Sequence, residues 1–229
     1  VFHRLAGTSA EICVAERAAG TVRTVATTSC WNFQQGSQAQ WLAGGGEPLV
    51  VFNDVVDGRL GCRLVDLEGV TRRFVPWPVQ AMHPGGREAL SLNYCRLDAL
   101  RPEYGYRVRV RNFRQDMPLE QDGIWRVDMQ RGTAELMISL AELVSHQPRP
   151  EMDGAAHKVN HILYSPSGRR FVFMHRWIRR LVKFSRLYVA NSDGSGLRLL
   201  MDEQVVSHYC WRDDEHLVVW GRTAEYGDR

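Results

Sequence analysis

Two histidines and a glutamine occupy matching points of similar strand–turn–strand segments: His161, His208 and Gln38. Imidazole nitrogen suits Zn or Mn, whereas an amide oxygen suits a harder ion such as Ca²⁺. We therefore expect His208, Gln38 and His161 to be candidate ligands of one divalent metal ion, Zn, Mn or Ca. The alternative is that the histidines only cap strand ends or hydrogen-bond to neighbouring sheets.

A third histidine, His175, is expected to end the strand that runs antiparallel to the one that His161 begins. A hairpin brings those two strand ends together, so the two imidazoles should face the same side of the molecule. Two nearby imidazoles can divide acid and base roles when their environments separate their pKa values. The alternative is that His175 is a surface residue at a strand end.

His175 opens a stretch in which arginines alternate with aromatic residues, among them Arg176 and Trp177. Guanidinium groups contact carboxylates or sulfates in a bidentate manner, and aromatic rings stack on sugars. Single-stranded nucleic acid would be bound by the same physics, but a net charge of only +3 makes that partner the least favoured. The stretch can also be a solvated hairpin loop.

Two further segments are richer in polar and aromatic residues than ordinary loops. One carries Trp31, Asn32 and Gln35, and the other, a long insertion at about 97–121, carries Arg101 and Tyr104. Long insertions in compact domains are often binding loops or lids. Packing between neighbouring sheets would explain the same residues.

The elements that must position these residues are short strands. Short β-rich runs, such as Thr71–Val75, Ala89–Cys95 and Arg170–His175, alternate with turn signals such as Asp57-Gly58 and Pro84-Gly85-Gly86. Such punctuation is typical of an antiparallel all-β fold. Residues 134–144 suit either a helix or an outer strand.

The strand pattern repeats. The interval from Gln38 to Val79 and that from His161 to His208 are each close to one propeller blade, about 40–50 residues. We predict a β-propeller of four-stranded antiparallel blades, one domain over 1–229, with the insertion at about 97–121. Residues 1–27 should supply the last three strands of one blade and 207–222 the first two of another. The chain then covers about four to five blades of a partial ring, although paired ends could close a four-bladed ring.

The amino-acid composition excludes few classes of protein. Hydrophobic residues make up 44% and charged residues 24%, as in ordinary globular proteins. No apolar run approaches the roughly 20 residues that span a bilayer, so we expect no membrane span. The five cysteines are widely spaced without a CxxC pair, and four of them lie in apolar or alternating stretches, which indicates buried thiols there rather than a disulfide framework.

Several short motifs resemble those of known propellers. Tyr-Ser-Pro-Ser-Gly at 164–168 and Asp193-Gly194-Ser195 resemble the repeats of TolB-like proteins. Asn160-His161, His175-Arg176-Trp177 and Ser207-His208-Tyr209, with Trp-Asn-Phe-Gln-Gln-Gly at 31–36, resemble the oligogalacturonate-lyase and ulvan-lyase group of polysaccharide lyases. That resemblance implies a seven-bladed ring, a bound metal, and β-elimination on a uronic acid by paired histidines or a histidine–tyrosine couple.

The resulting hypothesis is a polysaccharide lyase that acts on an anionic polysaccharide or oligosaccharide. β-Elimination needs a base for the proton α to a carboxylate and a positive centre for the resulting enolate. His161 or His175 would be the base, and Tyr104 or Tyr209 the acid. The expected substrate contacts are Arg176, Trp177, Arg101, Trp31, Gln35 and Asn32, with Arg176 or the metal at the carboxylate. The alternative is a non-catalytic propeller that binds glycan or protein.

Overall fold

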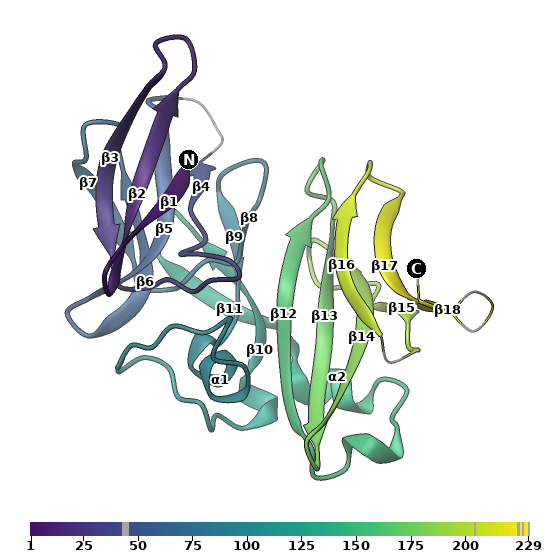
Figure 1. Cartoon of the computed structure of the whole chain (residues 1–229). Helices are drawn as coiled ribbons and strands as arrows, with labels where there is room; N and C mark the ends of the chain where they lie inside the picture. Colours follow the sequence, from purple (N-terminus) through teal and green to yellow (C-terminus); the bar gives the residue numbers. More distant parts are fainter. Residues whose placement is uncertain (43–45, 204, 224, 226, 229) are drawn as a thin grey trace. The chain divides into compact units, whose positions relative to one another are not determined.

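The computed structural model describes the whole chain except residues 43–45, 204, 224, 226 and 229. It contains two compact units (Figure 1). The first comprises Val1–Met117 and Arg126–Glu135, and the second comprises Pro118–Trp125 and Leu136–Arg229.

Antiparallel sheets in which consecutive strands pair with each other form most of the first unit. The first sheet has the order β1-β2-β3: β1 (Phe2–Ala6), β2 (Ser9–Glu16) and β3 (Thr21–Thr28). The next has the order β4-β5-β6-β7: β4 (Gln40–Leu42), β5 (Leu49–Val56), β6 (Arg59–Val65) and β7 (Thr71–Val75).

The middle sheet contains the two strands that flank the long insertion. Its order is β11-β10-β9-β8: β8 (Ala81–Met82), β9 (Glu88–Ser91), β10 (Gly123–Asp128) and β11 (Thr133–Ser139). Between β9 and β10 lie helix α1 (Tyr94–Leu100) and the 3₁₀ helix η1 (Leu119–Gln121).

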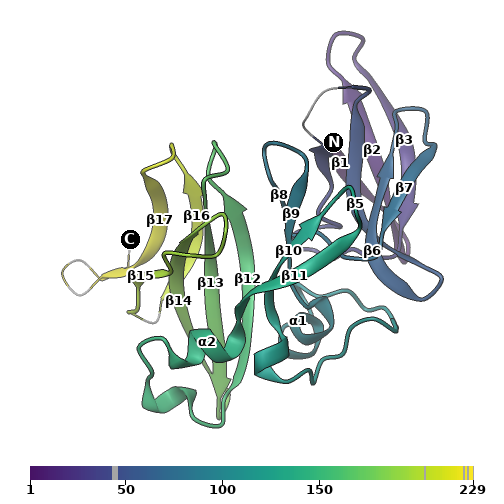
Figure 2. The same ribbon diagram turned by 180° about the vertical axis from the view of Figure 1, so that it is seen from behind.

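The second unit has the same meander. One sheet has the order β12-β13-β14-β15: β12 (Ala156–Tyr164), β13 (Arg170–Arg179), β14 (Val182–Asn191) and β15 (Arg198–Met201). The last has the order β16-β17-β18: β16 (Val206–Trp211), β17 (Leu217–Thr223) and β18 (Gly227–Asp228). Helix α2 (Leu140–Ser145), which lies beside β12 (Figure 2), and the 3₁₀ helix η2 (Pro150–Met152) lie between β11 and β12 in the chain.

This architecture confirms the predicted fold class, an all-β chain of antiparallel propeller blades. The incomplete first and last sheets also match the expectation, because β1–β3 form three strands and β16–β17 begin another sheet. The single-domain prediction for 1–229 stays a prediction, and the long segment at 97–121 does lie between two paired strands.

Element boundaries differ from the sequence-based expectation at two places. A strand expected at Ala89–Cys95 ends at Ser91, because the Asn93 side chain accepts hydrogen bonds from the backbone N–H groups of Cys95 and Arg96 and so caps α1. Residues 134–144 contain both candidate elements, since β11 ends at Ser139, whose side chain caps α2.

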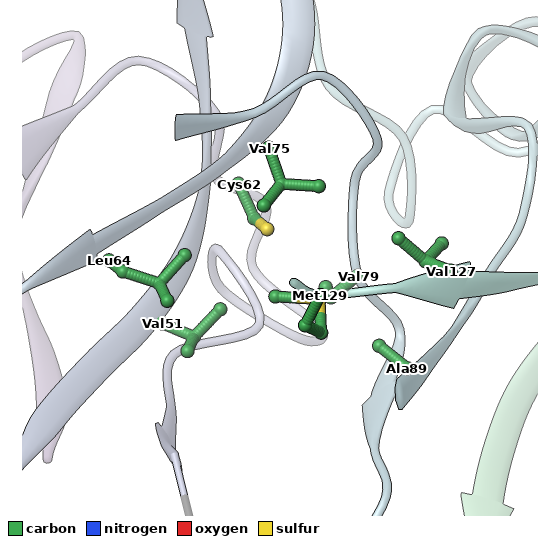
Figure 3. Packing of buried hydrophobic residues seen from close by; sticks show 8 residues of the cluster. All are labelled: Val51, Cys62, Leu64, Val75, Val79, Ala89, Val127 and Met129. Carbon is green, nitrogen blue, oxygen red and sulfur yellow. The ribbon is translucent and has the colours of Figure 1, made fainter. Parts of the chain in front are cut away.

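The core of the first unit lies between facing blades. Side chains from β5, β6 and β7 meet others from β9 and β10, together with Val79, which precedes β8, and Met129, which follows β10 (Figure 3). Alternate residues of each strand supply them because side chains point to opposite faces with period two. Burial raises the pKa of the Cys62 thiol in this cluster to about 12, so it behaves as a small apolar residue. The eight buried members are Val51, Cys62, Leu64, Val75, Val79, Ala89, Val127 and Met129.

Candidate functional site

Gln38 and His161 occupy the same kind of position in two different blades. Gln38 has φ 57° and His161 has φ 56°, both in the left-handed region that non-glycine residues rarely adopt. Each follows a residue that pairs with the neighbouring strand, Ser37 with Asn53 and Asn160 with Met174. An extra residue on the first strand of each blade produces this bulge, and bulges redirect a side chain. The predicted equivalence of Gln38 and His161 therefore has a backbone counterpart.

His208 lies beside a third bulge. On β16 the register shifts between Val206 and Tyr209, as it shifts on β12 between Asn160 and Leu163. If the two strands are aligned at their bulges, Ser207 corresponds to His161. If they are aligned at the turns that follow them, His208 corresponds to His161. His208 is exposed. Both histidines lie inside their strands, because β12 begins at Ala156 and β16 at Val206.

Three residues predicted from the sequence meet between the last two sheets. The Tyr209 hydroxyl donates a hydrogen bond to the backbone carbonyl of His161. Arg176 donates from Nη2 to the Val206 carbonyl at 3.3 Å, and its charge acts on the Tyr209 phenol. His161, Arg176 and Tyr209 are all half-buried. Together with Lys158 they are called the Tyr209 cluster below.

Lys158 adds a second cation to this cluster. It lies directly opposite Arg176 in the β12–β13 register and is 3% exposed. Like charges directly opposite each other on a sheet repel, so a nearby negative group stabilises both. The face that carries Arg176 is the one whose Val172 and Met174 pack toward β16 and β17. Lys158 and Arg176 thus place two positive charges on this face, beside Tyr209.

Burial raises the pKa of the Tyr209 phenol well above its usual range, and the Arg176 charge opposes this shift. The phenol is thus protonated at neutral pH, and its proton is donated to the His161 carbonyl. A guanidinium and an ammonium are suited to a carboxylate, the former with two donors in a fixed fork. The cluster holds the groups of an acid and of an anion-binding site.

The opposite face of β13 carries His175 in a closed environment. His157 donates from Nε2 to the Met152 carbonyl at 3.1 Å, which leaves its Nδ1 to accept from His175 Nε2 at 3.0 Å. His175 is completely buried. Burial, then His157, then Arg186 lower its pKa well below the ordinary value, so it is neutral.

Trp177 belongs to the same closed face and is 1% exposed. Its ring stacks on Phe184 at 5.2 Å, and the Arg186 guanidinium lies 5.5 Å from its centroid. Arg186, also 1% exposed, forms two hydrogen bonds to Asp202 at 2.6 and 2.9 Å. A bulky glycan would reach His175 or Trp177 only if their neighbours moved.

In the first unit the structure brings Asn32, Arg101 and Tyr104 together. Asn32 is buried and donates from Nδ2 to the Tyr104 carbonyl at 3.0 Å. Its Oδ1 accepts from the Gln34 and Gln35 backbones, which orders that loop. The Arg101 guanidinium lies 5.3 Å from the Tyr104 ring centroid. These contacts make Asn32 a loop-ordering residue.

Trp31 lies at the rim of a cavity of about 210 Å³ in the same unit, beside His3 and Phe33. Its indole donates to the Thr8 carbonyl at 3.0 Å, and its ring meets Phe33 edge to face. Gln35 is half-buried at the same loop. Trp31 and Gln35 as glycan contacts stay predictions.

The predicted metal ligands divide between the units, with Gln38 in the first and His161 and His208 in the second. Within the part of the chain that the structure describes, no three His, Cys, Asp or Glu side chains are arranged to hold a metal ion. The divalent metal stays a prediction.

Sequence reasoning missed Lys158, His157 and Asp202. All three acquire their roles from pairing across strands or blades, Lys158 with Arg176, His157 with His175 and Asp202 with Arg186. The alternating pattern around residues 156–164 indicated a strand, but only its register with β13 could have identified these neighbours.

No protein-family model matches this chain, and no curated protein matches its sequence. Among the described residues, no helix has the length and apolar character that crossing a membrane requires.

Proposed function

We propose that this chain is a carbohydrate-active propeller protein that acts on a uronic-acid-containing glycan by β-elimination. The observation that carries the proposal is the Tyr209 cluster, in which a protonated phenol lies at the His161 backbone beside the paired cations Arg176 and Lys158. The resemblance of the residues around His161 and Tyr209 to the oligogalacturonate-lyase and ulvan-lyase group supports the same assignment.

In the proposed reaction Arg176, which is half-buried, binds the uronate carboxylate, and the buried Lys158 opposite it adds its positive charge without touching the glycan. They lower the energy of the enolate that forms when the proton α to that carboxylate leaves. The C–H electron pair becomes the new C=C bond, and the C–O bond to the β oxygen breaks. Tyr209 donates its proton to that leaving oxygen, while His161 is the candidate base.

The test is incubation with a panel of polyuronides while the absorbance of the unsaturated uronate product is followed. Tyr209→Phe removes only the hydroxyl, so we expect elimination to fall by at least about 100-fold while unfolding free energy changes by about 1 kcal/mol. Tyr188→Phe is the matched control, because Tyr188 lies on the closed face. Equal activity of both variants would refute the role of Tyr209.

The second candidate function is glycan binding without catalysis. The observation that favours it is the complete burial of His175, which removes one of the two expected bases from direct contact with a polymer. Polyuronide binding that depends on Arg176, without any unsaturated product across the panel, would establish this alternative. Absence of both binding and product would reject both functions.

A further inference from the structure

The tip of the β13–β14 hairpin combines exposed aliphatic and basic side chains. The two strands are paired up to Arg179 and Val182, which leaves Arg180 and Leu181 as a two-residue turn. Leu181 is 93% exposed and Val182 54%. Arg180 and Lys183 are exposed on either side of them. These residues, 179–183, are called the hairpin tip.

The turn at this tip does not have the sequence that its backbone favours. Arg180 has φ 47° and Leu181 has φ 69°, so both central residues adopt left-handed values, as in a type I′ turn. Asn-Gly and Asp-Gly are strongly preferred there, because other residues clash with their own backbone in this region.

Another hairpin of this chain has the preferred turn sequence. The β5–β6 hairpin also has a two-residue turn, between the paired residues Val56 and Arg59, with φ 49° at Asp57 and 69° at Gly58. One hairpin thus has Asp-Gly and the other Arg-Leu at the same backbone geometry. Folding alone does not explain Arg-Leu at the hairpin tip.

Side-chain contacts fix the two strands next to the hairpin tip. Trp177 and Phe184 are cross-strand partners whose rings stack at 5.2 Å, two residue pairs before the Arg179–Val182 pair. Arg179 is tied to the Pro150 carbonyl at 2.6 Å. The aliphatic apex is therefore presented at the end of a stiff hairpin, visible at the foot of β13 and β14 in Figure 1.

We propose that the hairpin tip docks this protein on an anionic lipid surface, with Leu181 and Val182 entering the interface and Arg180 and Lys183 contacting the headgroups. The proposal rests on the exposed apex, its flanking cations and the turn sequence, and it is independent of the Tyr209 cluster. Aliphatic side chains gain from leaving water at a bilayer interface. The cations are attracted to acidic lipids, each by about fivefold in partitioning. A glycan would use the cations but gain little from two aliphatic side chains.

The decisive variant is Arg180→Asn with Leu181→Gly, which gives the turn its favoured sequence. We expect it to fold at least as stably as the wild type, by thermal unfolding, while its partitioning to vesicles containing phosphatidylserine falls at least tenfold. Wild-type binding should weaken with salt and be slight on phosphatidylcholine alone. Asp57→Asn, at the equivalent turn of β5–β6, is the control and should bind as the wild type does.

Three outcomes would overturn the proposal. They are no wild-type binding to phosphatidylserine vesicles, equal binding by the double variant, and binding that Arg180 and Leu181 direct to an acidic protein or polyuronide instead of the vesicles. Because Arg176→Gln should leave vesicle binding intact, failure of this proposal and failure of the proposed elimination are separable.

Discussion

The two faces of strand β13 differ in what their polar groups can reach. On one face His175 is completely buried against His157, and the nearby Arg186 is paired with Asp202. On the other face Arg176 is half-buried beside Lys158 and Tyr209. On the closed face His175 Nε2 and Arg186 have partners, although His175 Nδ1 and Trp177 Nε1 have none among the described residues, whereas the other face carries two positive charges beside a phenol. The same strand therefore carries a structural network on one side and the candidate site on the other.

The largest effect should come from breaking the closed network at Asp202. Asp202→Asn leaves the Arg186 charge, 1% exposed, without its carboxylate, and we expect a loss of about 3 kcal/mol in unfolding free energy. Urea denaturation followed by tryptophan fluorescence measures it. Asp213→Asn, at an exposed ion pair, is the control and should cost much less than Asp202→Asn. A similar small loss for Asp202→Asn would mean that the network is not closed.

On the face of β13 that carries Arg176, the substitution Arg176→Gln should weaken polyuronide binding by about 10- to 100-fold, because a charge-assisted bidentate contact is lost. Titration with an oligouronide measures the affinity, and a urea midpoint close to that of the wild type would exclude unfolding. Arg169→Gln, at a more exposed arginine, is the matched control. If both variants bind alike, the charge on this face is not the ligand contact.

Lowering the pH should reduce the stability of the fold first through His175 on the closed face. Since the folded-state pKa of His175 lies well below its ordinary value of 6.5, its contribution is complete above about pH 6.5 and is lost as the pH falls toward the lowered folded pKa. We expect stability to fall by about 1 kcal/mol per pH unit below pH 6. His175→Gln should flatten this dependence and His208→Gln should not. An unchanged slope in His175→Gln would assign the effect to other groups.

The smallest effect is expected at His208. Its side chain is exposed, so His208→Ala should change unfolding free energy by less than about 0.5 kcal/mol. The predicted metal site would show itself separately, as a thermal shift of the wild type on addition of Zn²⁺ that this variant lacks. A shift of equal size in both proteins would remove His208 from the ligand set.

The strand pattern and its turn signals determined the fold class from the sequence, because period-two alternation and Asp-Gly or Pro-Gly turns are local properties. The repeat also indicated His161, whereas Arg176 was a candidate because of the basic and aromatic residues around it, and Tyr209 because of the resemblance to the lyase group. The helix α1 was missed, since its N-terminal cap at Asn93 lies in an apolar run that reads equally well as a strand.

Register and the packing of one blade on the next were decided only by the tertiary structure. A shift of one residue exchanges the two faces of a strand, so the sequence could not say that His175 and Trp177 lie inward while Arg176 lies on the face toward β16. The pairings of His157 with His175 and of Lys158 with Arg176 follow from that register. The sequence determined which residue types are present and in which strands, and long-range strand pairing determined which of them meet.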